Sequence, residues 1–188
     1  MSEEIYIVMN KPKGYVCSAA SDSHKTVYEL LPPELQDLVK NAKRGHRLHT
    51  IGRLDSDTTG LLLLTTDGKF SHRIAAAGIA KTYLATLKNP VTKEQQTQYI
   101  SRAGQRLLLP AEKKAPEQQA APAKLHFIGP NSCEITITEG KFHVVRRIFR
   151  ALGNEVTELE RTAIGVFELP KDLMPGQYGF FTPEQIVF

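Results

Sequence analysis

The sequence has few of the features that hold a chain together covalently or anchor it in a membrane. Its two cysteines, Cys17 and Cys133, belong to no pair with the spacing of metal ligands, so we expect no zinc site. A reducing compartment is the default for so few cysteines, although the two could also form one bridge. No apolar run approaches the roughly 20 residues of a membrane-spanning helix, and the first residues lack the apolar core of a signal peptide. We therefore expect a soluble, cytoplasmic protein.

The length of 188 residues fits one domain, in which two sub-lobes could share a core. A chain of this size buries about 70% of its unfolded surface, so it needs neither disulfides nor metals for stability. We expect a single catalytic domain over residues 1–188.

Positive charge is concentrated in two segments that contain no acid. Residues 41–53 hold four lysines and arginines, and residues 141–150 hold another four. Because the net charge is +4, the rest of the chain carries a formal charge of −4. Local concentration of this kind is what a phosphate-binding surface requires. Two ordinary solvated faces are the alternative.

Strand and helix patterns are mixed without a regular strand–helix–strand alternation. Short apolar or alternating runs predict strands over residues 5–9, 61–66, 82–87, 124–129, 133–140, 156–160 and 165–169. Helical patterns follow Thr26 and occur from residue 34, over 68–77, near 92–102 and over 142–152. This mixture predicts an α+β fold with a central, largely antiparallel sheet flanked by helices. The segment 110–123 holds three prolines and four charges, so we expect a mobile loop there.

The predicted helix over residues 142–152 is amphipathic. Its apolar side chains recur at i, i+3, i+4 and i+7, namely Val145, Ile148, Phe149 and Leu152. The opposite face is expected to hold three basic residues, His143, Arg147 and Arg150. Arg146 lies at the boundary, where a side chain can project along the surface of the core.

Residues 52–68, GRLDSDTTGLLLLTTDG, place two carboxylates directly before a predicted buried strand. Asp55 and Asp57 could be turn residues that cap the backbone. A glycosidase-like acid pair is a second interpretation, but two carboxylates two residues apart on one loop seldom face each other across a sugar. A third is a nucleophile at Asp55 whose geometry is fixed by the strand that follows it.

Four motifs that follow one another along the chain favour the third interpretation, a nucleophile at Asp55. They are KPKG at residues 11–14, the 52–68 segment, KTY at 81–83 and EGKFHVVRRIF at 139–149. Together they resemble the pseudouridine synthases of the RsuA family, which isomerise uridine in ribosomal RNA. The resemblance runs from about residue 7 to the C-terminus and implies an α+β pseudouridine synthase fold with an active-site cleft. Two departures are Val144, where the family usually has glutamine, and a start directly at the catalytic domain without an S4 RNA-binding module.

The resemblance implies a catalytic role for three residues. Asp55 matches the essential aspartate, which would add to C1′ of the uridine or act as a base in a glycal elimination. Arg146 matches the arginine that forms an ion pair with this aspartate and keeps it ionised. Tyr83 matches the active-site tyrosine, whose ring could stack on the displaced uracil and whose hydroxyl could relay a proton. From the residues alone, Arg146 could equally be a solvated basic residue, and Tyr83 a core aromatic.

Several basic residues are candidate contacts to the RNA. Arg53 is expected to fill the space left by a flipped base or to hold the adjacent phosphate. The candidate phosphate contacts are Lys11, Lys13, Arg44, Lys81, Arg147 and Arg150. The family's reaction needs no cofactor and no metal, so none is expected.

The resemblance favours small-subunit 16S rRNA as the substrate, within an assembly intermediate of the subunit, and a monomeric enzyme. One alternative is the same reaction on 23S rRNA or on another RNA. The other is a non-catalytic RNA-binding or ribosome-assembly protein that keeps the scaffold.

Overall fold

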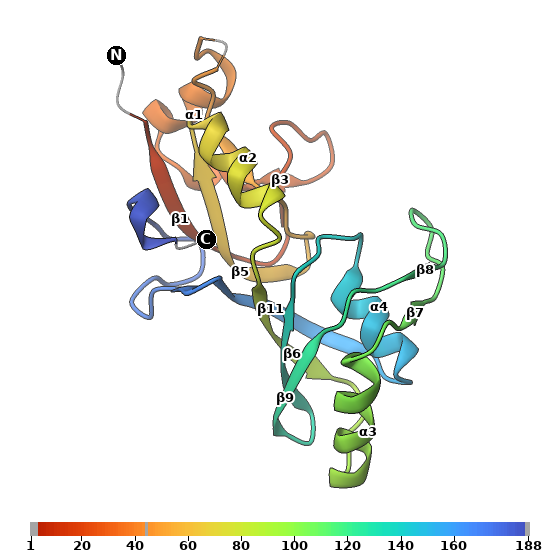
Figure 1. The fold of residues 1–188 in the computed structure, drawn as a ribbon. Helices are drawn as coiled ribbons and strands as arrows, with labels where there is room; N and C mark the ends of the chain where they lie inside the picture. Colours follow the sequence, from red (N-terminus) through yellow and green to blue (C-terminus); the bar gives the residue numbers. More distant parts are fainter. Residues whose placement is uncertain (1–3, 44, 187–188) are drawn as a thin grey trace. The chain divides into compact units, whose positions relative to one another are not determined.

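The computed structural model describes residues 4–43 and 45–186, and the chain divides into two compact units. The first unit comprises Met1–Ile79 and Arg161–Phe188, and the second comprises Ala80–Glu160. Each unit contains antiparallel strands and helices (Figure 1).

The sheet of the first unit is centred on two long strands. β1 (Tyr6–Lys11) pairs antiparallel with β5 (Thr58–Thr65) and with β13 (Tyr178–Phe180). β4 (His49–Ile51) also pairs antiparallel with β5. β11 (Val156–Ile164) starts in the second unit and enters the first at Arg161, where it pairs with β12 (Phe167–Glu168).

Short elements complete the first unit. They are the parallel pair β2 (Tyr15–Val16) and β3 (Lys25–Thr26), the 3₁₀ turns η1 (Val27–Leu30) and η2 (Pro183–Gln185), and the helices α1 (Pro33–Lys40) and α2 (Gly68–Ala76). α2 begins at Asp67, whose carboxylate accepts hydrogen bonds from the backbone N–H groups of Lys69 and Phe70. Such a cap satisfies donors that a helix N-terminus leaves without intrahelical partners.

Both faces of β5 are buried, which explains why its sequence is a continuous apolar run. Leu61 and Leu63 pack in one cluster with Phe70 and Ile74 of α2. The intervening Leu62 and Leu64 point to the other face and are also fully buried. An alternating pattern is expected only for a strand with one solvated face. This packing makes β5 the most rigid support available to the loop that precedes it.

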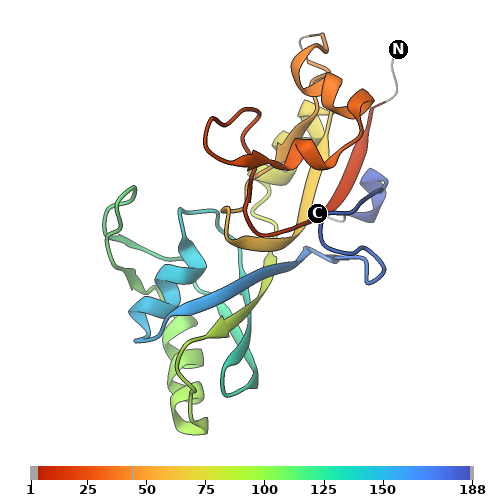
Figure 2. The same ribbon diagram turned by 180° about the vertical axis from the view of Figure 1, so that it is seen from behind.

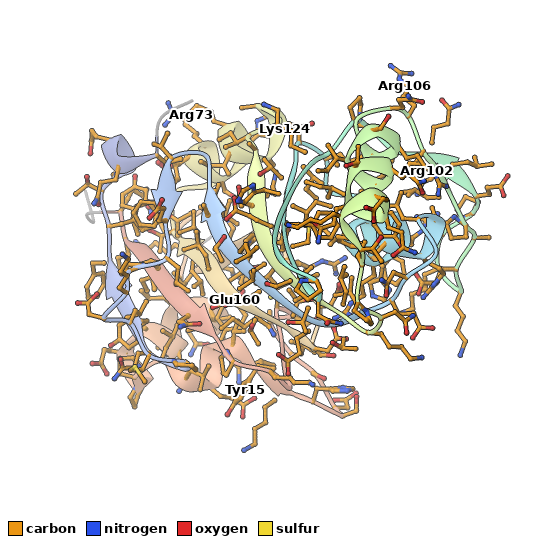
Figure 3. The ribbon with its side chains drawn as sticks, turned by 90° about the horizontal axis from the view of Figure 1, so that it is seen from below. Tyr15, Arg73, Arg102, Arg106, Lys124 and Glu160 are labelled. Atoms are coloured by element: carbon orange, nitrogen blue, oxygen red, sulfur yellow. The ribbon has the colours of Figure 1, made fainter. Side chains whose placement is uncertain are left out.

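In the second unit, β10 (Ser132–Ile137) lies between β6 (Lys81–Leu87) and β9 (Lys124–Gly129) and pairs antiparallel with both. α3 (Lys93–Ala103) starts with a capping box formed by Thr92 and Gln95. Arg102 of α3, labelled in Figure 3, donates from Nη2 to the carbonyl oxygen of Ala151 at the end of α4 (Val144–Ala151) at 2.9 Å. This bond ties the two helices together.

The segment predicted to be a mobile loop contains paired strands. β7 (Leu108–Leu109) and β8 (Gln118–Gln119) form a hairpin that lies beside α4 (Figure 2), and Glu112 bridges to Ala115 across its tip. The composition of this segment concealed the hairpin, because main-chain and side-chain hydrogen bonds hold it rather than an apolar pattern.

The predicted α+β class is confirmed, and most predicted elements occur within a few residues of their expected bounds. The helix predicted over 142–152 is shorter, because α4 begins only at Val144. Within the described part of the chain, no helix is both long and apolar enough to cross a membrane.

Candidate active site

Asp55 lies in the loop between β4 and β5 of the first unit, where the backbone is tightly held. The N–H of Thr58 donates to the carbonyl oxygen of Asp55 at 3.1 Å, which closes a turn around the two carboxylates. The N–H of Gly14 donates to the carbonyl oxygen of Ser56 at 2.7 Å. Gly14 has a φ of +90°, a conformation that glycine adopts without strain. The predicted KPKG turn therefore packs directly against the Asp55 loop.

Lys11 is fully buried beneath this loop. Its ammonium donates to the carbonyl oxygens of Thr58 at 2.8 Å, Pro12 at 3.2 Å and Ser56 at 3.4 Å. Burial lowers the pKa of Lys11 below its usual value, while the nearby thiol of Cys17 and the carboxylates of Asp57 and Asp55 act in the opposite direction. The three bonds use all the donors of an ammonium group.

This position corrects the prediction that Lys11 contacts an RNA phosphate. A side chain with no exposed surface, whose donors are directed at carbonyl oxygens, supports the protein backbone instead. Lys13 and Arg53 are exposed on the same unit, so their predicted contacts to RNA stay compatible with the structure.

Cys17 and Arg161 complete the support of the loop. The thiol of Cys17 contacts the backbone of Leu54, with the N–H of Leu54 at 3.4 Å and its carbonyl oxygen at 3.5 Å. Burial raises the pKa of this thiol, and the Leu54 hydrogen bond and the charges of Lys11, Arg161 and Arg53 partly offset that effect. Arg161 is only 3% exposed and donates from Nε to the carbonyl oxygen of Leu61 at 2.7 Å.

Arg161 is not among the predicted site residues, although the sequence carries a signal for its burial. In the alternating pattern of β11, Leu159 and Arg161 are two residues apart and are both buried. A period of two therefore placed this arginine on the same inward face as the leucine.

Arg146 lies in the first turn of α4 in the second unit. Its side chain is half-buried, and Nη1 donates to the carbonyl oxygen of Val156 at 2.9 Å. The residue before the helix, His143, has a left-handed backbone with φ 47° and ψ 29°. This conformation is uncommon for a residue other than glycine. The ring of His143 stacks on Phe142 at 3.8 Å, and Nδ1 lies 3.2 Å from Glu112 of the hairpin.

Arg147 is the second predicted phosphate contact that the structure corrects. Its side chain is fully buried and donates to the carbonyl oxygens of Pro116 at 2.6 Å, Pro110 at 3.0 Å and Phe142 at 3.4 Å. The predicted polar face of the helix is covered here by the hairpin. Arg150 is exposed, with its guanidinium 3.6 Å from Glu112.

Tyr83 and Lys81 lie on β6 of the second unit, opposite Ile135 and Ile137 of β10. Tyr83 is 8% exposed, so most of its ring belongs to the interior. Arg44 lies outside the described residues. The candidate residues therefore fall into two groups, with Lys11, Lys13, Arg53 and Asp55 on the first unit and Lys81, Tyr83, Arg146, Arg147 and Arg150 on the second.

No group of three or more histidine, cysteine or acidic side chains within residues 4–43 and 45–186 could hold a metal ion. The chemistry that these residues offer is that of a carboxylate on a rigid loop, an arginine at a helix start and a buried tyrosine.

Residues 5–151 match the family of RNA pseudouridylate synthases, which is more than half of the chain. The chain belongs to this family. The predicted family and the predicted pseudouridine synthase fold are thereby confirmed. A crystal structure of a pseudouridylate synthase that is 38% identical superimposes with a TM-score of 0.83, over 98% of this chain and 73% of that one. A chain of an archaeal box H/ACA sRNP Nop10–Cbf5 complex, at 16% identity and a TM-score of 0.58, shows a likeness of fold alone.

Among curated relatives, the ribosomal small subunit pseudouridine synthase A of Escherichia coli (strain K12) is 41% identical over 183 residues. This alignment covers 96% of the present chain and 72% of that protein. The protein of the same name from Haemophilus influenzae is 38% identical over 188 residues, covering 99% of this chain and 74% of that protein. The family member described here is thus an enzyme that acts on RNA.

Proposed function

We propose that this pseudouridylate synthase converts one uridine of small-subunit 16S rRNA to pseudouridine. The observation that carries the proposal is the identity of 38–41% to ribosomal small subunit pseudouridine synthases A over nearly the whole chain. The substrate is RNA within an assembly intermediate of the small subunit, and the enzyme acts as a monomer in the cytoplasm.

Asp55 is the group that detaches the uracil. In one route its carboxylate oxygen bonds to C1′ while the C1′–N1 bond breaks, and the freed uracil then turns over. C5 next bonds to C1′, the carboxylate leaves, C5 loses its proton and N1 gains one. In the other route Asp55 removes the proton from C2′ while the C1′–N1 bond breaks, which gives a glycal and free uracil. C5 then bonds to C1′ as Asp55 returns the proton to C2′, and C5 loses its proton while N1 gains one. Both routes need an ionised oxygen at a fixed position, and the hydrogen bonds of Thr58, Gly14 and Lys11 to this loop support that role.

Arg146 and Tyr83 act on the reaction from the second unit. Arg146 forms an ion pair with Asp55 that favours the ionised carboxylate, and its anchorage to Val156 supports a fixed guanidinium. Tyr83 stacks on the displaced uracil. A ring already held inside a sheet loses little freedom when a base stacks on it.

Exposed basic residues hold the RNA backbone. Arg53, two residues before Asp55, fills the space that the flipped base leaves in its stack, which lowers the cost of flipping. The phosphate contacts come from Lys13, Arg44, Lys81 and Arg150.

The deciding experiment maps pseudouridine in small-subunit rRNA by carbodiimide labelling and primer extension. The RNA is incubated, bare or bound to ribosomal proteins, with the wild type, with Asp55→Ala or with Asp57→Ala. We expect one new stop with the wild type and with Asp57→Ala, and none with Asp55→Ala. The stop should be stronger on protein-bound RNA.

Other results would point elsewhere. A stop in 23S rRNA alone would replace the proposed substrate. RNA binding without any stop, unchanged by Asp55→Ala, would indicate a binding protein that keeps the scaffold.

A further inference from the structure

The first unit contains a pocket of about 430 Å³ that none of the proposed catalytic residues lines. Gly45, Arg47, His49 and Gly68 line it. These residues come from the segment that leads into β4 and from the first position of α2. A pocket of this volume lies within the range of small-ligand sites in proteins.

The pocket lies far from Asp55 along the same strand. His49 is opposite Thr65, at one end of β5, whereas the Asp55 loop enters β5 at Thr58. Seven residues of strand at a rise of about 3.3 Å separate the two ends by roughly 23 Å. A ligand in this pocket is therefore not the uridine that reacts at Asp55.

The chain segments that contribute to the pocket are rich in basic residues, of which Arg47 lines the pocket itself. The exposed basic residues on the two flanking segments are Lys43, His46, Arg47, Lys69, His72 and Arg73. Arg73, labelled in Figure 3, lies over the ring of Phe70 at 5.7 Å. Two acids lie on or beside these segments: Glu4 is 3.6 Å from His46, and Asp67 caps α2. The surface around the pocket thus favours an anionic ligand.

His49 adds a chemical preference to this charge. Its Nδ1 lies 2.9 Å from the carbonyl oxygen of Arg47, and a carbonyl oxygen only accepts hydrogen bonds. Nδ1 therefore carries a hydrogen, and in the neutral ring Nε2 is left to accept from a nucleobase N–H or a ribose hydroxyl. Arg47 can pair with a phosphate through two parallel hydrogen bonds. One nucleotide offers both partners at once.

We propose that this pocket binds a nucleotide of the RNA substrate outside the reaction site, with its phosphate at Arg47 and its base or ribose at His49. The inference rests on the proposed action on RNA and adds a second contact point. A stacked strand rises roughly 3.4 Å along its axis per nucleotide, so in a stacked strand this nucleotide lies about six or seven positions from the target uridine.

Gly68 allows a test that fills the pocket without removing any contact. A Cβ placed on Gly68 meets no atom within 4 Å, and α2 should tolerate a larger residue there because Gly is the poorest helix former after Pro. Gly68→Phe should fill the space, and Gly68→Ala is the matched control. Arg47→Ala removes the proposed phosphate contact, and Lys171→Ala, at an exposed lysine elsewhere on the unit, controls for net charge.

The measurement is the Kd of fluorescent oligouridylates of 20 and 5 nucleotides across a salt series. We expect Gly68→Phe and Arg47→Ala to weaken binding of the 20-mer about five- to tenfold, while both controls bind like the wild type. Binding of the 5-mer should change in none of them. Arg47→Ala should also reduce the salt slope by about 0.7.

Equal 20-mer binding by Gly68→Phe and Gly68→Ala, or an equal loss in Arg47→Ala and Lys171→Ala, would overturn the proposal. Pseudouridine formation by the wild type is scored separately. An inactive wild type would count against the proposed function, whereas an active one with unaffected variants would count against the pocket alone.

Discussion

The Asp55 loop and the β7–β8 hairpin are both held by a buried cation, but the two cations do different work. Lys11 donates to three carbonyl oxygens around the loop and lies near two carboxylates. Arg147 donates to the carbonyl oxygens of Pro110 and Pro116, one on each arm of the hairpin. The first cation fixes the proposed catalytic loop on a strand that is buried on both faces. The second supplies order to a segment that has few apolar side chains of its own.

The comparison predicts that Arg147 contributes more to stability than Lys11. Arg147→Leu leaves three carbonyl oxygens without their donor, and each unsatisfied buried group costs about 1–3 kcal/mol. We expect the free energy of unfolding to fall by about 3 kcal/mol, as measured by urea denaturation. Hydrogen exchange should accelerate in residues 108–119 before it does in β6.

Arg150→Leu is the matched control, because Arg150 is exposed on the same helix and its pair with Glu112 should contribute under about 1 kcal/mol. If the two variants were equally stable, the hairpin would not depend on the buried guanidinium.

Lys11→Met should lower the stability less than Arg147→Leu does, but it should lower the activity more. Burial already disfavours the charged ammonium, so its removal also removes a desolvation cost that partly offsets the lost hydrogen bonds. We expect the free energy of unfolding to fall by about 1–2 kcal/mol. Displacement of the Asp55 loop should lower kcat by at least about tenfold, since small misplacements of reacting groups are costly. Single-turnover pseudouridine formation measures this effect.

The pH dependence of stability provides an independent check on Lys11. Its pKa is lowered by folding, so the unfolded chain binds more protons just below pH 10.5. The wild type should therefore gain stability relative to Lys11→Met as the pH rises through that window. A constant difference between the two proteins would contradict the burial of a charged ammonium.

Tyr6 should show the opposite sign and the smallest effect. Its hydroxyl donates to Asp67 at 2.9 Å, and burial together with this carboxylate raises the pKa of Tyr6 to about 12. The contribution of this bond is complete below pH 10 and is lost as the pH rises towards 12. Tyr6→Phe should lower stability by about 1 kcal/mol at pH 8 and by less at pH 11. Thermal unfolding of the wild type and Tyr6→Phe at pH 8 and at pH 11 measures this difference, and an equal loss at both pH values would contradict the prediction.

The sequence predicts the elements of this fold well and the roles of its buried cations poorly. Periodicity and capping residues are local, so β5, α2 and β10 could be located from neighbouring residues alone. The partners of Lys11 at Ser56 and Thr58 are more than 40 residues away, and they are main-chain atoms that any residue carries. No pattern of side chains in the sequence indicates where such main-chain acceptors lie.

The candidate site is predicted from sequence motifs rather than from composition or periodicity. Asp55, Tyr83 and Arg146 are assigned catalytic roles because the order of four motifs resembles one family. That family is confirmed, and the three roles stay predictions. Composition alone left Asp55 as a turn residue. Arg147 was misplaced because helical periodicity describes the helix by itself, whereas the hairpin that covers its polar face comes from a distant, proline-rich segment.

The anchoring of the hairpin also bears on limited proteolysis. Its tip carries Lys113 and Lys114, both exposed between the bridged residues Glu112 and Ala115, and therefore offers trypsin a cleavage site. Arg147 forms hydrogen bonds to the chain on both sides of that site, at Pro110 and at Pro116. A cut between the two lysines would sever the polypeptide without releasing either end. The nicked protein would migrate as two fragments in a denaturing gel and as one species in a native gel.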